Sequence, residues 1–113
     1  MIPFARLEEV MAAAGRRTGY TLLDEKDGCT GGCRCGISIY RREEYDLERA
    51  AAHEDQEGFF VLEGRGRALI GGEELVMEPG VCFVVPAGTL HAMKRDADCE
   101  YCKVFWFHAA VQK

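Results

Sequence analysis

The 113-residue chain lacks any long hydrophobic run. No apolar stretch approaches the roughly 20 residues that a membrane-spanning helix needs, so the sequence predicts no membrane span. Its first nine residues, MIPFARLEE, also lack the basic head and the apolar stretch of a signal peptide. We therefore expect a cytoplasmic protein with no membrane partner, and the length fits one domain over residues 1–113.

A surplus of positive charge is also missing. Lys and Arg sum to 14 against 19 Asp and Glu, which gives a net charge of −5. Because contacts to phosphates need a basic face, this balance argues against a nucleic-acid partner. Six cysteines are present, and without an export signal we expect reduced thiols rather than three disulfides, since the cytosol keeps thiols reduced.

Apart from one short helix, the chain has the period of two that is typical of strands. Pro3, the apolar spacing and Gly15 predict a docking or lid helix over residues 3–14, within an N-terminal segment 1–15. The expected strands are 20–23, 36–41, 58–62, 67–70, 75–77, 81–85 and 103–108. Gly71-Gly72 predicts a two-residue hairpin, and residues 85–88 a type I turn. Short strands joined by tight turns indicate an all-β sandwich or barrel.

Three side chains form the candidate site. His53 and Glu57 are four residues apart, so in an extended segment both leave the same face. His91 follows a turn after the apolar strand 81–85. Two neutral imidazoles and one carboxylate, with open positions, suit Fe(II) and also Zn, Mn or Ni, so we expect a divalent transition metal held by His53, Glu57 and His91. The alternative is that the three side chains bond to one another and to water without a metal.

Two motifs in the chain resemble those of the cupins. In the first, Glu57 is followed by six residues and Gly64, with His53 at the second histidine position. In the second, Gly80, Pro86, Gly88 and His91 have the family spacing. The resemblance covers residues 36–108 and implies a cupin-type jelly-roll β-barrel of two antiparallel sheets with a short N-terminal helix. It also implies a homodimer, because single-domain cupins of this size typically pair through a sheet edge.

The sequence departs from the cupin pattern at two positions. The first histidine of the family is replaced by Ala51, and an asparagine that often follows the last histidine is replaced by Arg95. If the strand begins late, Ala51 faces solvent. Otherwise a ligand position is missing, and water or a substrate would take its place.

The chain also resembles the ligand-sensing cupin domains of arabinose-type transcription regulators. That resemblance lies in four stretches, namely residues 53–57, 61–64, 86–91 and 101–108. Those domains commonly bind small effectors without a metal. Two functions therefore stay open: a small metal-binding cupin that binds a small organic molecule, with the reaction and even enzymatic activity undetermined, or a non-enzymatic sensor module for a sugar-like effector.

The remaining candidates have structural interpretations. His108 is expected at the rim of the barrel rather than as a ligand. Isolated arginines are expected to be solvated, with recognition of a carboxylate as the alternative, and the barrel lining to be one parity set of the strand residues. Cys82 is expected in the core. The other cysteines could form a four-thiolate zinc site, or two of those within Cys29 to Cys35 could form a redox-responsive pair. The arginines are Arg65, Arg67 and Arg95. The cysteines are Cys29, Cys33, Cys35, Cys99 and Cys102. The lining set is Phe59, Val61, Phe83, Val85, Phe105 and Phe107, or their neighbours of opposite parity.

Overall fold

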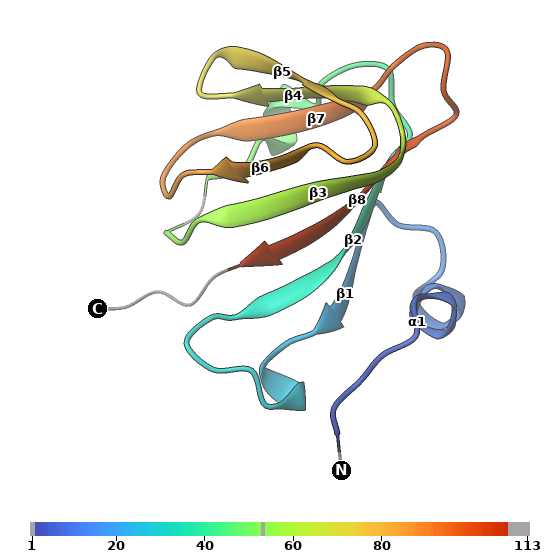
Figure 1. Cartoon of the computed structure of the whole chain (residues 1–113), viewed down its shortest axis with the longest axis vertical. Helices are drawn as coiled ribbons and strands as arrows, with labels where there is room; N and C mark the ends of the chain where they lie inside the picture. Colours follow the sequence, from blue (N-terminus) through green and yellow to red (C-terminus); the bar gives the residue numbers. More distant parts are fainter. Residues whose placement is uncertain (1, 53, 109–113) are drawn as a thin grey trace.

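The computed structural model describes residues 2–52 and 54–108 and forms two antiparallel sheets that face each other. One sheet has five strands in the order β1-β2-β8-β3-β6, and the other has three in the order β5-β4-β7. Figure 1 shows the two sheets as the walls of a barrel, with the helix lying outside it. The elements are α1 (Leu7–Ala14), β1 (Gly19–Leu23), β2 (Arg34–Tyr40), β3 (Glu57–Gly64), β4 (Gly66–Ile70), β5 (Glu73–Met77), β6 (Cys82–Val85), β7 (His91–Arg95) and β8 (Cys102–His108), with single 3₁₀ turns at Glu25–Asp27 and Leu47–Arg49. The all-β jelly-roll prediction is confirmed.

The expected strands are all found, but one further strand, β7, was not predicted. Its sequence, His-Ala-Met-Lys-Arg, has no alternation of apolar and polar residues and therefore gives no local strand signal. Tertiary pairing with β4 and a backbone bridge between Ala51 and His91 hold it in place. The barrel also begins before residue 36, because β1 pairs with β2 from Gly19 onward.

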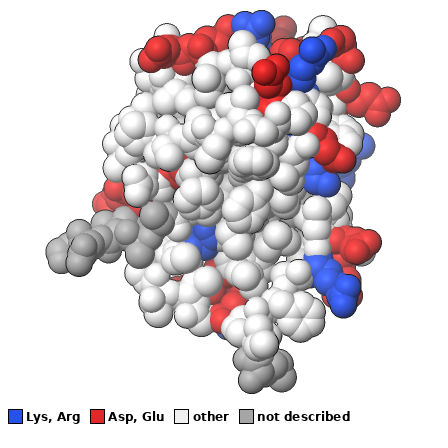
Figure 2. All heavy atoms as spheres, in the orientation of Figure 1, with Lys and Arg blue, Asp and Glu red and all other residues white. Residues whose placement is uncertain are grey.

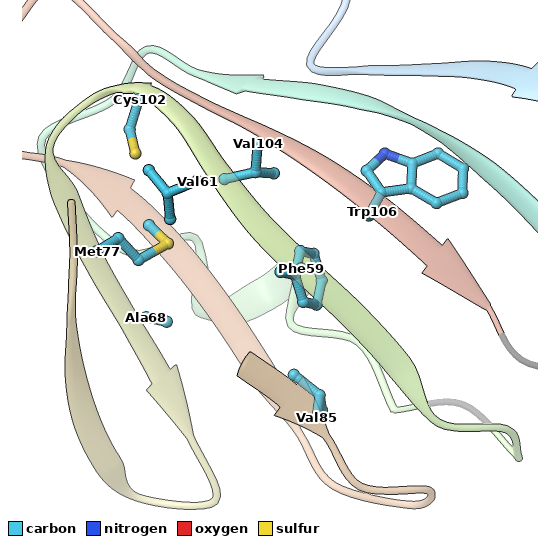
Figure 3. Close-up of a cluster of buried hydrophobic side chains, with 8 residues drawn as sticks. All are labelled: Phe59, Val61, Ala68, Met77, Val85, Cys102, Val104 and Trp106. Atoms are coloured by element: carbon cyan, nitrogen blue, oxygen red, sulfur yellow. The ribbon is translucent and has the colours of Figure 1, made fainter. Parts of the chain in front are cut away.

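The core lies between the two sheets and draws on five strands. Eight side chains form it, and Figure 3 shows them pointing toward one another from β3, β4, β5, β6 and β8: Phe59, Val61, Ala68, Met77, Val85, Cys102, Val104 and Trp106. On β3 and β6 the odd-numbered residues face inward, whereas on β8 the even-numbered ones do. The predicted lining is therefore confirmed for Phe59, Val61, Phe83 and Val85. On β8 the alternative of opposite parity holds, because Phe105 and Phe107 face outward.

The helix α1 is one turn shorter than predicted and docks on the outside of the barrel. Leu7, Val10 and Met11 pack against the outer face of β1 and β2, over the buried residues Tyr20 and Ile37. Residues 2–6 are exposed. A helix this short depends on packing, which explains why it begins at Leu7.

Two glycine turns set the path of the chain. Gly71 and Gly72 have φ values of 56° and 86°, which confirms the tight hairpin between β4 and β5. The second turn lies one residue later than predicted, because the amide of Thr89 donates to the carbonyl of Pro86 (3.2 Å) and Gly88 has a φ of 76°. Since the third turn residue has positive φ, the turn is type II rather than type I. His91, the first residue of β7, follows two residues after this turn.

Candidate functional site

The site lies where one row of residues in the five-stranded sheet faces one row in the three-stranded sheet. In the first row, the register places His108 of β8 directly between Arg34 of β2 and Glu57 of β3. In the second row, His91 of β7 lies between Ala51 and Ile70. Neighbouring residues of a row have side chains on the same face. Residues far apart in sequence therefore meet at one level of the barrel.

Glu57 lies between two imidazoles inside the barrel. Its Oε1 is 3.4 Å from Nε2 of His91, and its Oε2 is 3.3 Å from Nε2 of His108. The three residues are only 7%, 9% and 3% exposed. A buried carboxylate is costly unless donors or a cation compensate its charge, and here two imidazoles are turned toward it. The predicted proximity of Glu57 and His91 is thus confirmed by the geometry.

His91 is held by the turn that precedes it. Its Nδ1 is 3.4 Å from the carbonyl oxygen of Thr89, which leaves Nε2 directed at Glu57. Burial alone would lower the pKa of His91, but the contact with Glu57 and the carbonyl groups of Thr89 and Ala51 outweigh it, so that the pKa is raised. The ring of Phe59 packs edge-on against the imidazole, with 6.1 Å between centroids, and closes the site toward the core.

His108 is a buried member of the site, so the prediction that it lies at the rim is wrong. Its Nδ1 is 2.8 Å from Oδ2 of Asp55, and Nη2 of Arg34 lies 3.4 Å from its Nε2. Burial raises the pKa of Asp55, but the hydrogen bond and the charge of His108 lower it by more, so the pKa is lowered overall. Asp55 was not predicted at all. For His108 a signal was available in the sequence. The alternation along β8 places it on the same face as Cys102, Val104 and Trp106.

A cavity of about 310 Å³ opens beside His91. Tyr40, Ala51, Met93, Arg41 and Asp46 are among the residues that line it. Burial raises the pKa of Tyr40, so its hydroxyl stays protonated and can act as a donor. Ala51 is half-buried and lines the cavity, although β3 begins only at Glu57. The small side chain leaves open the space next to the imidazole.

The residues of the site fit a metal in part. The donor set has the right chemistry, because Glu57 and His91 are buried and Nε2 of the imidazole faces the carboxylate. Residues 2–52 and 54–108 contain no group of three His, Cys, Asp or Glu side chains arranged to hold a metal ion. The predicted ligand His53 lies outside the described residues, so the full triad of His53, Glu57 and His91 stays a prediction.

The three arginines considered for carboxylate recognition are engaged elsewhere. Arg65 pairs with Asp98, and Arg67 lies 3.1 Å from Glu74. Arg95 is not solvated as expected, because it donates to the carbonyl groups of residues 41, 96 and 99 at 2.7, 3.1 and 2.9 Å. It therefore joins the crossing segment after β2 to the turn before β8, a structural role away from Glu57.

The cysteines form two separate clusters of free thiols. Cys35 pairs with Phe107 and Cys102 with Tyr40, so the clusters stand at opposite ends of β2 and β8, about 16 Å apart at the strand rise per residue. A zinc site built from both clusters is therefore excluded. Cys82 is exposed on the outer face of β6, so the prediction that it lies in the core is wrong. Burial and, for Cys29, neighbouring Cys33 raise the pKa values of Cys29 and Cys35, which disfavours a reactive pair.

Comparison with known proteins bears on the fold. Hydroxypropylphosphonic acid epoxidase from S. wedmorenis superimposes with a TM-score of 0.64 at 16% identity, covering 80% of this chain and 49% of that one. The cupin domain of Cnp3 from Schizosaccharomyces pombe gives 0.69 at 12% identity, covering 89% and 67%. The conserved protein SPY1581 from Streptococcus pyogenes, described as of unknown function, gives 0.66 at 15%, covering 84% and 75%. This chain spans about half the length of the epoxidase.

No curated protein sequence matches the chain. The resemblance to arabinose-type regulators stays a prediction. No described helix is long and apolar enough to cross a membrane. The cupin domain model, however, matches residues 42–108, which is more than half of the chain and contains both predicted motifs. Together with the two-sheet barrel, this match shows that the chain belongs to the cupin family.

Proposed function

We propose that this cupin binds a divalent transition metal through His53, Glu57 and His91 and binds a small organic molecule in the cavity beside Ala51. The observation that carries the proposal is the buried contact between Oε1 of Glu57 and Nε2 of His91, at 3.4 Å. Nδ1 of His91 faces the carbonyl group of Thr89. Such an acceptor at Nδ1 fixes the orientation of an imidazole that binds a metal through Nε2.

The donor chemistry limits the choice of metal. Two imidazoles and one carboxylate with open positions suit Fe(II), and they also accept Zn, Mn or Ni. Iron is the first metal to test, because one structural neighbour is an Fe(II) form of HppE. A metal bound there would supply Lewis-acid or oxygen-binding chemistry. In this chain, Glu57 and His91 would hold it, and Phe59 would exclude water on the core side. The proposal covers binding and assigns no reaction.

The cavity suits a small ligand. Its volume of about 310 Å³ lies at the lower end of the range for small-molecule sites. His91, Ala51 and Tyr40 are among the residues that line it. A ligand bound there would lie within reach of the metal, which links the two halves of the proposal.

Elemental analysis of protein purified without chelator tests the metal. We expect about one equivalent of transition metal per chain, lost in His91→Ala and Glu57→Gln. Cys82→Ser is a matched control, because Cys82 is exposed on the outside of the barrel and should leave the metal content unchanged. A metal-free preparation that also fails to bind added Fe, Mn, Ni and Zn would contradict the proposal.

A metal-free sensor module is the second candidate. One observation favours it: Glu57 contacts both His91 and His108. In the part of the chain that the structure describes, no three His, Cys, Asp or Glu side chains are arranged to hold a metal ion. In that case a sugar-like effector would raise the melting temperature in the presence of EDTA. The same effector would fail to do so in a variant whose cavity is filled, such as Ala51→Trp.

We also propose a cytoplasmic homodimer. The outer face of β3 and β6 carries exposed apolar side chains, with Phe60 40% and Val84 50% exposed. On the face shown in Figure 2, most charged residues lie at the upper end and along the right margin, and a few more lie in the lower centre and at the left. Light scattering after gel filtration should give twice 12.6 kDa for the wild type and the monomer mass for Val84→Glu, with the exposed Val76→Glu as the control. Reduced thiols in fresh cell extracts would support the cytoplasmic location.

A further inference from the structure

His108 occupies a position that the proposed ligand set does not explain. It is 3% exposed, and among the described residues its ring is in contact with a carboxylate at each nitrogen. Nδ1 lies 2.8 Å from Oδ2 of Asp55, and Nε2 lies 3.3 Å from Oε2 of Glu57. A buried imidazole fixed at both nitrogens cannot rotate freely, so its orientation is set by the two acids.

The two oxygens of Glu57 therefore face different partners. Oε1 is turned to His91 on the opposite sheet, whereas Oε2 is turned to His108 on the neighbouring strand. The cross-strand register imposes this arrangement, because Glu57 and His108 are direct partners on β3 and β8. A glutamate side chain has three rotatable bonds, and without the contact at Oε2 its carboxylate could turn away from His91.

We propose that the pair of Asp55 and His108 holds Glu57 by Oε2 and so keeps Oε1 aimed at His91 and the metal position. His108 is a positioning residue, and Asp55 orients it. The inference rests on the proposed metal function and deepens it, since it names the outer support of the site. Such support commonly changes metal affinity by about 10- to 100-fold when removed.

Arg34 fits the same arrangement. It is the other cross-strand partner of His108, and its Nη2 lies 3.4 Å from Nε2 of the imidazole. A guanidinium cation near that nitrogen disfavours a metal ion there. The metal position therefore lies on the His91 side of Glu57, which leaves His108 to act through the carboxylate rather than as a ligand.

Two amide substitutions separate the roles of the two nitrogens. In His108→Gln, the terminal amide nitrogen lies as many bonds from the backbone as Nε2 does, so the contact with Glu57 is kept. In His108→Asn, the amide reaches only the position of Nδ1, so the contact with Asp55 is kept and that with Glu57 is lost. Asp55→Asn removes the charge that orients His108, and the exposed Glu54→Gln is the matched control.

The measurement is the affinity for Co²⁺ alone, by calorimetry, with the stoichiometry and the visible absorption band as further readouts. We expect His108→Asn to weaken binding by about 10- to 100-fold at an unchanged stoichiometry of one. Asp55→Asn should weaken it less, while His108→Gln and Glu54→Gln stay close to the wild type. Thermal unfolding in EDTA checks that each variant is folded, and Asp55→Asn keeps the test informative if His108→Asn does not fold.

The outcomes distinguish the two proposals. If the wild type binds no Co²⁺, the proposed metal function fails, and this inference fails with it. If His91→Ala abolishes binding while His108→Asn and Asp55→Asn bind as tightly as the wild type, only the positioning role is overturned. Complete loss of Co²⁺ in both His108→Gln and His108→Asn would also overturn it, because that result would make His108 a ligand.

Discussion

Ala51 and His91 lie directly opposite each other as a hydrogen-bonded antiparallel pair. The amide of Ala51 donates to the carbonyl of His91 at 3.2 Å, and the amide of His91 donates back at 2.9 Å. In such a pair the two side chains leave the same face of the sheet, with Cβ atoms about 5 Å apart. Whatever residue stands at position 51 therefore lies beside the imidazole of His91.

A histidine introduced at position 51 should strengthen metal binding. In Ala51→His, a further imidazole would lie next to His91 and add a ligand to the site. We expect the affinity for Co²⁺ to rise at least about tenfold, which is about 1.4 kcal/mol. Ala52→His is the matched control, because Ala52 is exposed and follows directly in sequence. Equal Co²⁺ affinities of the two variants would contradict the prediction.

The stability of the metal-free protein should depend on the protonation of His91. Its pKa is raised in the folded state: burial opposes this, but Glu57 and the carbonyls outweigh it. Protonated His91 therefore contributes stability that is fully present below the unfolded pKa of about 6.5 and is lost as pH rises through the folded value. In EDTA, the difference in melting temperature between the wild type and His91→Ala should shrink from pH 6 toward pH 9. A difference that grows over this range would show the opposite sign.

Gly64 should not tolerate a side chain. It ends β3 with a φ of 74°, and a Cβ atom there would collide with the carbonyl oxygen of Tyr101. We expect Gly64→Ala to lower the free energy of unfolding by about 2–4 kcal/mol, from backbone strain and overpacking together. Gly72 also has positive φ but open space around it, so Gly72→Ala should cost only about 1–2 kcal/mol. Urea denaturation of both variants measures the difference, and similar losses would argue against the collision.

Arg95 should stabilise the fold without affecting the metal. Nε and Nη1 of its guanidinium group donate to three carbonyl oxygens that no shorter side chain at this position can reach together. We expect Arg95→Asn to cost about 1–3 kcal/mol of stability, because these acceptors lose their donors. The exposed Arg65→Ala should cost no more than about 1 kcal/mol. Loss of Co²⁺ affinity in Arg95→Asn at unchanged stability would contradict this role.

The six thiols should react with an alkylating agent in the order of their exposure. Cys33 and Cys82 are exposed and should be modified first in the native protein. Cys102 should react only after unfolding, because burial raises its pKa to about 11, with a smaller effect from Cys99. Iodoacetamide labelling at pH 8, followed by peptide mass spectrometry, gives the order. Early labelling of Cys102 would place it outside the core.

The predictable parts of this structure depend on local chemistry. Gly71 and Gly72 predict a hairpin, because glycine readily adopts the positive φ that both turn positions need. The strands β3 and β4 can be predicted from their apolar runs. Glu57 and His91 could be selected because a family motif contains them. The alternation along β8 puts His108 on the same face as Trp106, but its contact with Glu57 depends on the pairing of β8 with β3. That pairing joins segments far apart in the chain and is not encoded near position 108.

The strand β8 is central in its sheet but follows all the other strands in the chain. Its two neighbours, β2 and β3, each pair with it along its length. During synthesis, β2 and β3 therefore leave the ribosome before β8, the strand that pairs with both. The contact between Glu57 and His108 forms only after residue 108 has emerged. Because such distant pairings are slow to form, we expect the barrel to close late in folding.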